Sequence, residues 1–541
     1  MNMLSRPSAA DIVFFNGTVF LPGGSSATGV AVGNGTILRV GGDEEVLSLA
    51  GFETEKIDLD GRLVVPGFID THIHFYEWAN NRSGLQLDRL ASLEELLGRL
   101  KKAVARREPG TWIVGQGWNE TEWDSPSTIS RDDLDRIAPK NPVLLWRCDL
   151  HLAVANSMAL KLAGIDGGSA DPAEGRIERD TSGRPTGVLR ELAINLVREV
   201  VPPPGPDEIK GAFLEAMAQL HRRGITSIHD VRLMADRDGG TALQVFRQLE
   251  EENSLDLRCW VGLPGERLDE CIELGLRTGF GSDRLRLGHV KYFADGGVGA
   301  RTAWMVDPYR DAECGMPLAD MEVLAQEIGK ADRNGLAVMV HAIGDRANRE
   351  VISIFENLED RRRLDRYGLP GVRHRIEHVQ VIQPRDIARL RRLPLALNVT
   401  PANLVLDINL IEKALGERGA WAYCIRQLVD TGLPVMFSSD CPVCDPDPLA
   451  GIRAAVFRQR SDGTPAGGWY PQARVAVETA LRCYSAVPAD VHNAPCLGVI
   501  EPGRRADLVV LNRNILSGSL SALSEATVDI TVFDGRIVFC R

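Results

Sequence analysis

Eight short apolar runs recur through the middle of this 541-residue chain, and most are followed by polar residues and then by a helical pattern. In chain order they are "LVVPGFIDTHIHF", "GITSIHDV", "LDLRCWVGL", "LRLGHVKYFADG", "LAVMVHAIGD", "HRIEHVQVI", "LPLALNVTP" and "LPVMFSSDCPV". Amphipathic stretches such as "MEVLAQEIGKADRNG" separate several of them. Alternation of strand and helix predicts parallel units. Eight such units predict an α/β fold, a TIM-like (β/α)8 barrel.

The two ends of the chain have a different pattern, which predicts short strands joined by tight turns. Asn-Gly and Asp-Gly pairs are typical of hairpin turns, and they occur at Asn16-Gly17, Asn34-Gly35, Asp60-Gly61 and Asp534-Gly535. We expect residues 1–63 and 497–541 to form one small β-sandwich domain built from both termini. The barrel then comprises residues 64–496, with a long insertion, residues 79–220, between its first and second strands.

The composition excludes several kinds of protein. Hydrophobic residues at 44% and charged residues at 25% describe a globular chain with a sizeable core. A net charge of −12 argues against a nucleic-acid partner. No stretch reaches the roughly 18 apolar residues that span a bilayer, no leader is evident, and the ten cysteines are scattered as reduced thiols are. We expect a cytoplasmic protein with a small-molecule substrate and no membrane partner; a homodimer is our default expectation.

Side chains that bind metals stand at the carboxyl ends of five of the eight runs. They are His72 and His74 in the first run, Lys291 in the fourth, His341 in the fifth, His378 in the sixth and Asp440 in the eighth. Barrel active sites form at that face, and the period of two in a strand lets both histidines of the first run reach one ion. Each residue alone has an ordinary structural reading. The ordered series predicts a divalent metal site, with zinc first and manganese or iron open.

Longer motifs surround these residues. They are "PGFIDTHIH", "GQGWNETEW", "RCDLHLAVANSMAL", "GITSIHDV", "VKYFADGGVGARTA", "VHAIGDRANREVISIFE", "RHRIEHVQ", "SSDCPV" and, near the end, "ADLVVLNRN". With this set the chain resembles the amidohydrolase superfamily, and within it the amidohydrolase family 3 branch that includes N-substituted formamide deformylase. The resemblance implies a metal-dependent hydrolase on a barrel with a flanking β-sandwich. The family commonly has a tryptophan where this chain has Cys441, so substrate identity does not transfer.

The resemblance also implies how the metal ligands divide. His72, His74 and Asp440 would hold the more buried ion, and His341 and His378 a second one. Lys291 would carry a CO2-derived carboxylate that bridges the two ions, which requires a neutral amine of the kind that burial favours. The alternative is a site with one ion and an unmodified lysine; we favour two ions.

The predicted reaction follows from such a site. A bound metal lowers the pKa of water to about 7 and polarises a carbonyl group. We expect Asp440 to act as general base and then as general acid. It takes a proton from the metal-activated water, which becomes hydroxide, and passes that proton to the leaving amine. The predicted substrate is an N-substituted amide or formamide, cleaved at a non-peptide C–N bond. An ester, lactone or carbamate would suit the same ligands, and a non-catalytic regulatory protein is the third alternative.

Four further residues are candidates for the pocket. His229, at the end of the second run, is predicted to bind substrate, with a structural histidine as the alternative. His151, in the insertion, is predicted to reach the site and bind substrate. Trp118 is predicted to form an aromatic wall with Trp123, and core packing would explain both equally well. Asp70 lies on the same strand face as the first histidines, and we expect it to orient a ligand from behind. A long insertion at this face often forms a lid or a specificity wall.

Two segments carry weaker signals. The glycine-rich stretch "ADGGVGARTA" lacks the spacing of a phosphate-binding loop, and Arg301 within it is expected to form an ion pair. The basic stretch "EDRRRLDRYG", residues 359–368, is expected to be a solvated helix end and not a nucleic-acid patch.

Overall fold

Eight parallel strands form one sheet at the centre of the molecule. They are β7 (Phe68–Ile73), β14 (Ile225–Asp230), β15 (Arg258–Pro264), β16 (Leu285–Phe293), β17 (Val338–Ala342), β18 (Arg375–His378), β19 (Ala396–Val399) and β20 (Val435–Phe437). Their order in the sheet follows the chain, and a parallel bridge between Ile73 and Cys441 joins β7 to the segment after β20. Each of the eight predicted runs supplies one strand of this sheet, and the first run also contains β6 (Leu63–Pro66) of another sheet, so the TIM-like barrel is confirmed.

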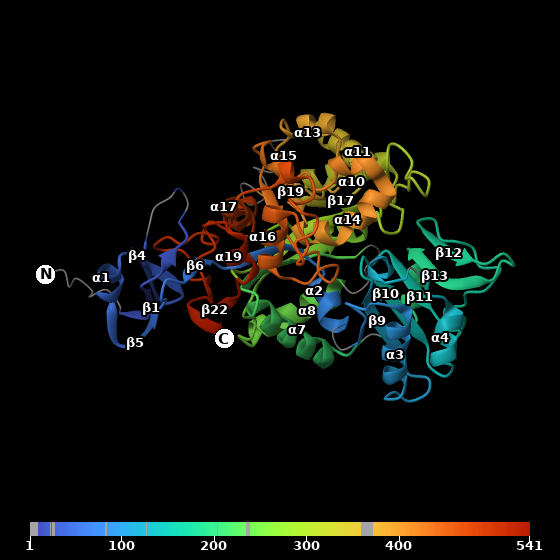
Figure 1. The fold of residues 1–541 in the computed structure, drawn as a ribbon, viewed down its shortest axis with the longest axis horizontal. Helices are drawn as coiled ribbons and strands as arrows, with labels where there is room; N and C mark the ends of the chain where they lie inside the picture. The colour runs from blue at the N-terminus through green and yellow to red at the C-terminus, as the bar shows by residue number, and fades with distance from the viewer. Residues whose placement is uncertain are drawn as a thin grey trace.

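The computed structural model describes residues 9–541 apart from 22, 24–26, 82–83, 126, 203, 234–238 and 359–371. The basic stretch at 359–368 therefore lies outside the described residues. Figure 1 shows the terminal strands at one end of an elongated molecule, the barrel in the middle and the insertion at the other end. None of the helices in the described part of the chain combines the length and apolar character that crossing a bilayer needs.

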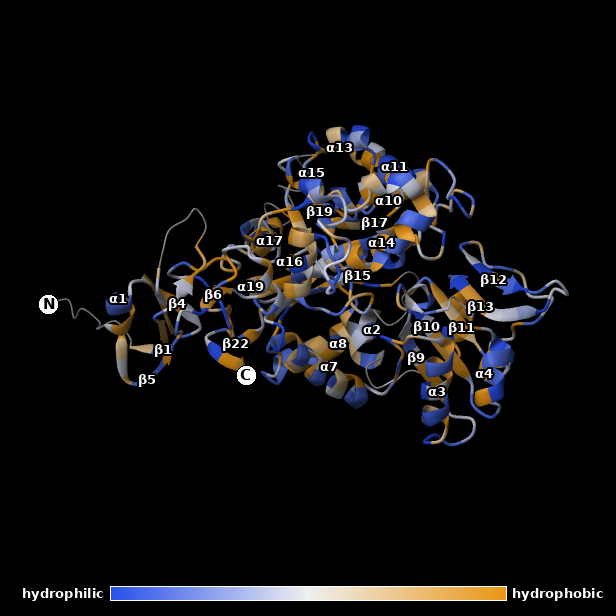
Figure 2. Cartoon of the chain, in the orientation of Figure 1, coloured by the Kyte–Doolittle hydropathy of each residue, from blue (hydrophilic) through white to orange (hydrophobic). Residues whose placement is uncertain are grey.

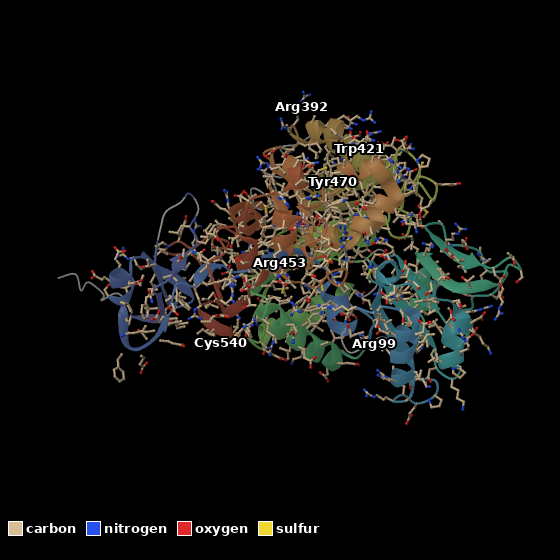
Figure 3. The ribbon with its side chains drawn as sticks, viewed as in Figure 1. Arg99, Arg392, Trp421, Arg453, Tyr470 and Cys540 are labelled. Carbon is tan, nitrogen blue, oxygen red and sulfur yellow. The ribbon has the colours of Figure 1, made fainter. Side chains whose placement is uncertain are left out.

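Helices surround the barrel because their apolar faces pack onto it. α10 (Met321–Arg333) begins where the Asp320 carboxylate accepts hydrogen bonds from two amide groups, at 2.8 and 3.1 Å. Its buried residues Leu324, Ile328 and Ala331 follow helical spacing. The other barrel helices are α2 (Phe75–Asn81), α7 (Pro206–His221), α8 (Gly239–Glu251), α9 (Leu268–Glu273), α11 (Asp345–Glu356), α13 (Pro384–Leu390), α14 (Pro401–Leu415), α15 (Ile425–Val429), α16 (Pro448–Phe457), α17 (Val477–Cys483) and α18 (Ala486–Val491). Arg392, after α13, projects outward from the barrel (Figure 3).

The terminal strands form two sheets that share one core. The first contains β4 (Thr36–Gly41), β3 (Gly29–Gly33), β1 (Ala10–Phe15) and β5 (Ala50–Asp58); the second contains β2 (Thr18–Val19), β6 (Leu63–Pro66), β21 (Leu508–Leu511), β22 (Val528–Phe533) and β23 (Arg536–Cys540). Buried residues of both ends, including Phe14, Val30, Leu508 and Val532, pack in one cluster. That these sheets form a separate domain stays a prediction.

Two of the four predicted hairpin turns are confirmed. Asn34-Gly35 joins β3 to β4 and Asp534-Gly535 joins β22 to β23, with positive φ at all four residues, as the tight hairpin turn requires. The prediction is wrong for Asn16-Gly17 and Asp60-Gly61. The strands on either side of those pairs belong to different sheets, so the turns redirect the chain without pairing its two arms.

The insertion folds as a six-stranded sheet of its own. In sheet order its strands are β12 (Gly175–Arg179), β13 (Pro185–Glu191), β11 (Leu152–Ala155), β10 (Val143–Arg147), β9 (Ile113–Trp118) and β8 (Leu85–Gln86). Helices α3 (Leu93–Val104) and α4 (Arg131–Ile137) pack in one core with Leu145 of β10, and α5 (Ser157–Leu162) and α6 (Ala193–Arg198) pack in another with Leu144 and Trp146. Figure 2 shows hydrophobic residues along β9 to β11 and hydrophilic residues over α4. The inserted sheet therefore has a separate core on each face.

Candidate active site

An open cavity lies where the carboxyl ends of the barrel strands meet the inserted sheet. Barrel residues on its wall include His74, Lys291, His341, His378 and Asp440, and residues of the insertion include Trp146, Asp149, Leu150, His151, Glu191 and Ile194. His72 lies just beneath, 1% exposed. The structure thus brings all six predicted metal ligands to one place.

The Asp440 carboxylate faces three imidazole rings. Its Oδ1 lies 3.4 Å from Nε2 of His72 and 3.4 Å from Nε2 of His74, and its Oδ2 lies 3.9 Å from Nδ1 of His378. One ligand atom from each of His72, His378 and Asp440 lies within 4.8 Å of the others. Such a buried group of nitrogen and oxygen donors is the ligand set that a divalent metal such as zinc takes.

His341 and Lys291 extend this group. The His341 ring centroid lies 4.5 Å from that of His378, and the Lys291 Nζ lies 4.6 Å from the ring centroid of Phe293. Among the residues that the structure describes, neither Lys291 Nζ nor His72 Nε2 has a hydrogen-bond partner, although both are buried. Buried polar atoms are nearly always paired, so these orphaned atoms fit a site completed by a metal.

The charges of the site also suit metal binding. Burial lowers the pKa of His72, His341 and His378 well below the usual value, so these rings stay neutral and keep a lone pair for a metal. Burial lowers the pKa of Lys291 to about 8, although nearby carboxylates oppose the change. Burial alone would raise the pKa of Asp440, but the neighbouring histidines lower it, so this group is a carboxylate.

Glu377 is a site residue that the sequence analysis missed. Its Oε2 accepts a hydrogen bond from Nδ1 of His72 at 2.5 Å, and it is held in turn by Arg375 at 2.8 Å and Asn398 at 2.8 Å. His72 therefore presents Nε2 toward the cavity. A signal was available in the sequence, because Arg375 and Glu377 stand two residues apart in one of the eight predicted strands and so share one face of it.

Asp70, which is predicted to orient a ligand, makes its hydrogen bonds to the main chain of His72 and to Ser439. Its Oδ2 accepts from the Ser439 hydroxyl at 2.5 Å, and its Oδ1 accepts from the amides of Ser439 at 3.1 Å and His72 at 3.3 Å. Asp70 thus fixes the main chain beside Asp440. The carboxylate that contacts a ligand ring directly is that of Glu377, which comes from β18.

The structure does not place His229 on the cavity wall. The side chain is 3% exposed and lies in the barrel interior, where its Nδ1 accepts a hydrogen bond from Arg375 at 3.1 Å. Its ring stacks on Trp260 and contacts His492, with centroids 5.7 and 4.0 Å away. The inward face of β14 meets a polar barrel interior below the metal ligands. His229 is therefore a structural histidine, the alternative given for it.

Trp118 also lies outside the cavity. It packs in the core beneath α3 and α4, with its ring centroid 6.3 Å from that of Trp123. Trp146, on the opposite face of the inserted sheet, is the tryptophan on the cavity wall. Alternate residues of a strand face opposite sides, and the sequence alone does not say which side meets the barrel.

Three remaining residues have clear positions. His151 reaches the cavity as predicted, with its ring centroid 5.7 Å from that of His341. Cys441 is buried behind the cavity, and its carbonyl accepts a hydrogen bond from the amide of His74 at 2.8 Å. Arg301 forms the expected ion pair, with Asp311 at 2.8 Å.

Comparison with known proteins gives consistent matches. The amidohydrolase family matches residues 55–539. The protein LONG AFTER FAR-RED 3 of Arabidopsis thaliana is 33% identical over 522 residues, covering 93% of this chain and 88% of that protein. The N-substituted formamide deformylase of Arthrobacter pascens is 26% identical over 535 residues, covering 96% of each. The crystal structure of an uncharacterized metal-dependent hydrolase from Pyrococcus furiosus matches with a TM-score of 0.72 at 30% identity, covering 93% of this chain and 99% of that chain.

The family match covers nearly the whole chain, and the ligand set in the cavity agrees with it. The chain therefore belongs to the amidohydrolase family, and it is a metal-dependent hydrolase that acts on carbon–nitrogen bonds.

Proposed function

We propose that this protein hydrolyses a small N-substituted amide, of the N-formyl or N-acyl amine type, to a carboxylate and an amine. The observation that carries the proposal is a cavity that brings two kinds of side chain together. The barrel contributes metal-binding side chains, Asp440 among them, and the insertion contributes the apolar Trp146, Leu150 and Ile194 beside polar residues such as Asp149. The metal-binding side chains suit a carbonyl group, and the apolar side chains suit a substituent on nitrogen. The likeness to a formamide deformylase over 96% of the chain supports this choice.

Two sets of side chains would hold the metal. His72, His74 and Asp440 would hold one divalent ion, and His341 and His378 a second. A divalent metal bound there would lower the pKa of a water molecule and polarise the substrate carbonyl. Zinc is the first choice because neutral imidazole and carboxylate donors suit it. Lys291 would join as a carbamate, in which the neutral amine adds to CO2 and loses one proton to give an anionic ligand.

Asp440 serves twice in the proposed reaction. It begins as a carboxylate, so it can accept the proton that the attacking water gives up. An amine is a poor leaving group unless its nitrogen is protonated, and Asp440 returns the same proton to that nitrogen. Its place among three imidazole rings fixes the carboxylate for both steps.

A substrate panel tests the proposal. The protein, reconstituted separately with zinc, manganese and iron, is assayed on N-formyl and N-acetyl amines and on matched esters, lactones and carbamates, with metal analysis of each sample. We expect hydrolysis of the amides with stoichiometric metal. Esters turned over far faster than the matched amides would favour the C–O alternative, and substoichiometric metal after reconstitution would contradict the site.

Other expectations stay predictions. The chain has a metal-binding residue type at each of the six predicted ligand positions, which argues against a non-catalytic regulatory protein on this fold. We propose a cytoplasmic homodimer, and light scattering after size exclusion measures its mass. A monomeric mass would contradict the dimer.

A further inference from the structure

Asp295 lies two residues after β16, the strand of Lys291, and its side chain is fully buried. Its Oδ1 accepts a hydrogen bond from the amide of Ile343 at 2.9 Å. Its Oδ2 accepts from the amides of Gly344 at 2.7 Å and Trp304 at 2.8 Å. Ile343 and Gly344 come directly after β17, the next strand of the barrel. Asp295 therefore ties its own segment to the end of a neighbouring metal-binding strand.

Asp295 and Trp304 stand at the two ends of a loop, residues 296–303, which consists of turns and irregular backbone. The hydrogen bond between them closes the loop, and within it the amide of Thr302 donates to the carbonyl of Gly297 at 3.1 Å. β17 is paired with β16 on one side and with β18 on the other. Because this strand is held from both sides, Asp295 passes the position of the strand on to the loop.

The inserted sheet rests directly on this loop. The Thr302 hydroxyl donates a hydrogen bond to Oε1 of Glu191 at 2.5 Å. A Cβ atom on Gly299 would lie 2.6 Å from Oδ2 of Asp149, a closeness that glycine alone permits. Glu191 and Asp149 both stand on the cavity wall. A continuous series of contacts therefore runs from β17 through Asp295 and the loop to the inserted wall.

We propose that Asp295 is a positioning residue that sets the distance between the inserted wall and the metal site. The kinetic consequence rests on the proposed function, in which the metal site takes the carbonyl group and the inserted wall contacts the substituent on nitrogen. A misplacement of about 1 Å can cost about 10²-fold in rate. A loosened loop should therefore harm substrates with a large substituent on nitrogen and spare those with a small one.

The test compares full-length, zinc-reconstituted variants. Asp295→Asn keeps the size of the side chain but replaces one acceptor oxygen with an NH2 group, which cannot accept from the amides that face it. Asp345→Asn is the matched control, because Asp345 is equally buried and also accepts from an amide, that of Val306 at 2.8 Å, outside the loop. Zinc content, hydrogen exchange, and kcat and KM on N-formyl-4-nitroaniline and N-methylformamide are measured for each.

We expect hydrogen exchange in Asp295→Asn to rise about tenfold in the loop and in residues 148–151 of the insertion. Zinc should be retained, because the strand pairs hold His341. The kcat/KM on N-formyl-4-nitroaniline should fall about 10–100-fold, and that on N-methylformamide should stay unchanged. Asp345→Asn should match the wild type in these measurements. A carboxylate with a structural role alone would lower the melting temperature without changing the ratio of the two substrates.

Gly299→Ala tests the same contact from the other end of the loop, and it decides the inference if Asp295→Asn does not fold. The added methyl group would lie 2.6 Å from Oδ2 of Asp149 and 2.7 Å from Nη1 of Arg147, so the inserted wall has to move. We expect the same selective loss on the aryl amide, with zinc retained. Gly98→Ala in α3 is the matched control, because a Cβ atom there meets nothing within 4 Å.

The results separate this inference from the proposed function. A wild type that hydrolyses neither amide contradicts the proposed function. In that case, and where only one amide is turned over, hydrogen exchange decides the inference alone. Unchanged exchange in residues 148–151 of Asp295→Asn overturns the inference, and so does an equal fall in kcat/KM on both amides. Loss of zinc from Asp295→Asn also overturns it, because the carboxylate would then act on His341 and not on the inserted wall.

Discussion

The two walls of the cavity are built in different ways. On the barrel wall, the six metal-binding side chains come from the ends of five strands, and the strands follow chain order. On the other wall, Trp146, His151 and Glu191 come from three strands or strand ends of one inserted sheet that has its own two cores. The barrel wall can therefore keep one chemistry while the inserted wall changes.

This difference separates the reaction from the choice of substrate. The ligands on the barrel are fixed by backbone positions that the whole barrel determines. The side chains of the inserted wall are positioned by the strand register of a separate sheet that packs against the barrel. A change on the barrel wall should remove metal or turnover, and a change on the inserted wall should alter binding of substrate while the metal stays.

Metal removal should have the largest effect on activity, and it should change the structure of the barrel wall only. Dialysis against a chelator should abolish hydrolysis, and added zinc should restore it, because no other group of the site would activate water. Hydrogen exchange should rise at the ends of β17 and β18, where ligands lose their ion, and stay unchanged in β10 and β11. Full activity of the chelated protein would contradict the metal site.

Asp440→Asn should have the next largest effect, a loss of about 10²–10⁴ in kcat, because an amide cannot accept the proton. The fold should survive, since Asp440 has a φ of +56° and asparagine adopts that conformation readily. Asp60→Asn is the matched control, at a turn residue with a φ of +46° far from the cavity. Turnover near the wild-type rate in Asp440→Asn would remove this residue from the mechanism.

Much of the barrel wall is predictable from sequence because its signals are local. An apolar run with a polar residue at its carboxyl end marks both a strand and the edge at which its side chain acts. His72, His341 and Asp440 are far apart in the chain, but each is marked by its own run. This pattern of an apolar run ending in polar residues predicts the eight strands and the six ligand positions.

The rest depends on contacts that no local pattern specifies. Glu377 matters because it meets His72, 305 residues away, and Glu191 matters because it meets Thr302, 111 residues away. Trp146 lines the cavity and Trp118 does not, because only one face of the inserted sheet meets the barrel. A shift of one residue in strand register would turn the other face toward the barrel. His229 ends an apolar run, but it meets a polar barrel interior.

Glu377→Gln should weaken zinc binding by about 10–100-fold, because a neutral amide holds His72 less firmly and makes it a poorer donor. Competition with a chromophoric chelator measures the affinity. The exposed Glu501→Gln is the control and should bind zinc as the wild type does. Unchanged zinc affinity in Glu377→Gln would mean that packing alone orients His72. The side chains of the barrel wall would then be positioned by packing, as those of the inserted wall are.

Two tryptophans give the sharpest test of the inserted wall, with the smallest expected effect on catalysis. Trp146→Ala should raise KM for an aryl-substituted amide about tenfold, because apolar contact with the substrate is lost, and zinc content should not change. Trp118→Ala removes the same atoms from the other face and should lower the free energy of unfolding by about 3–5 kcal/mol without changing KM. Urea unfolding and steady-state kinetics on both variants separate the two effects. An equal rise in KM in both would mean that the insertion acts as one body, and that the face a residue occupies does not decide its role.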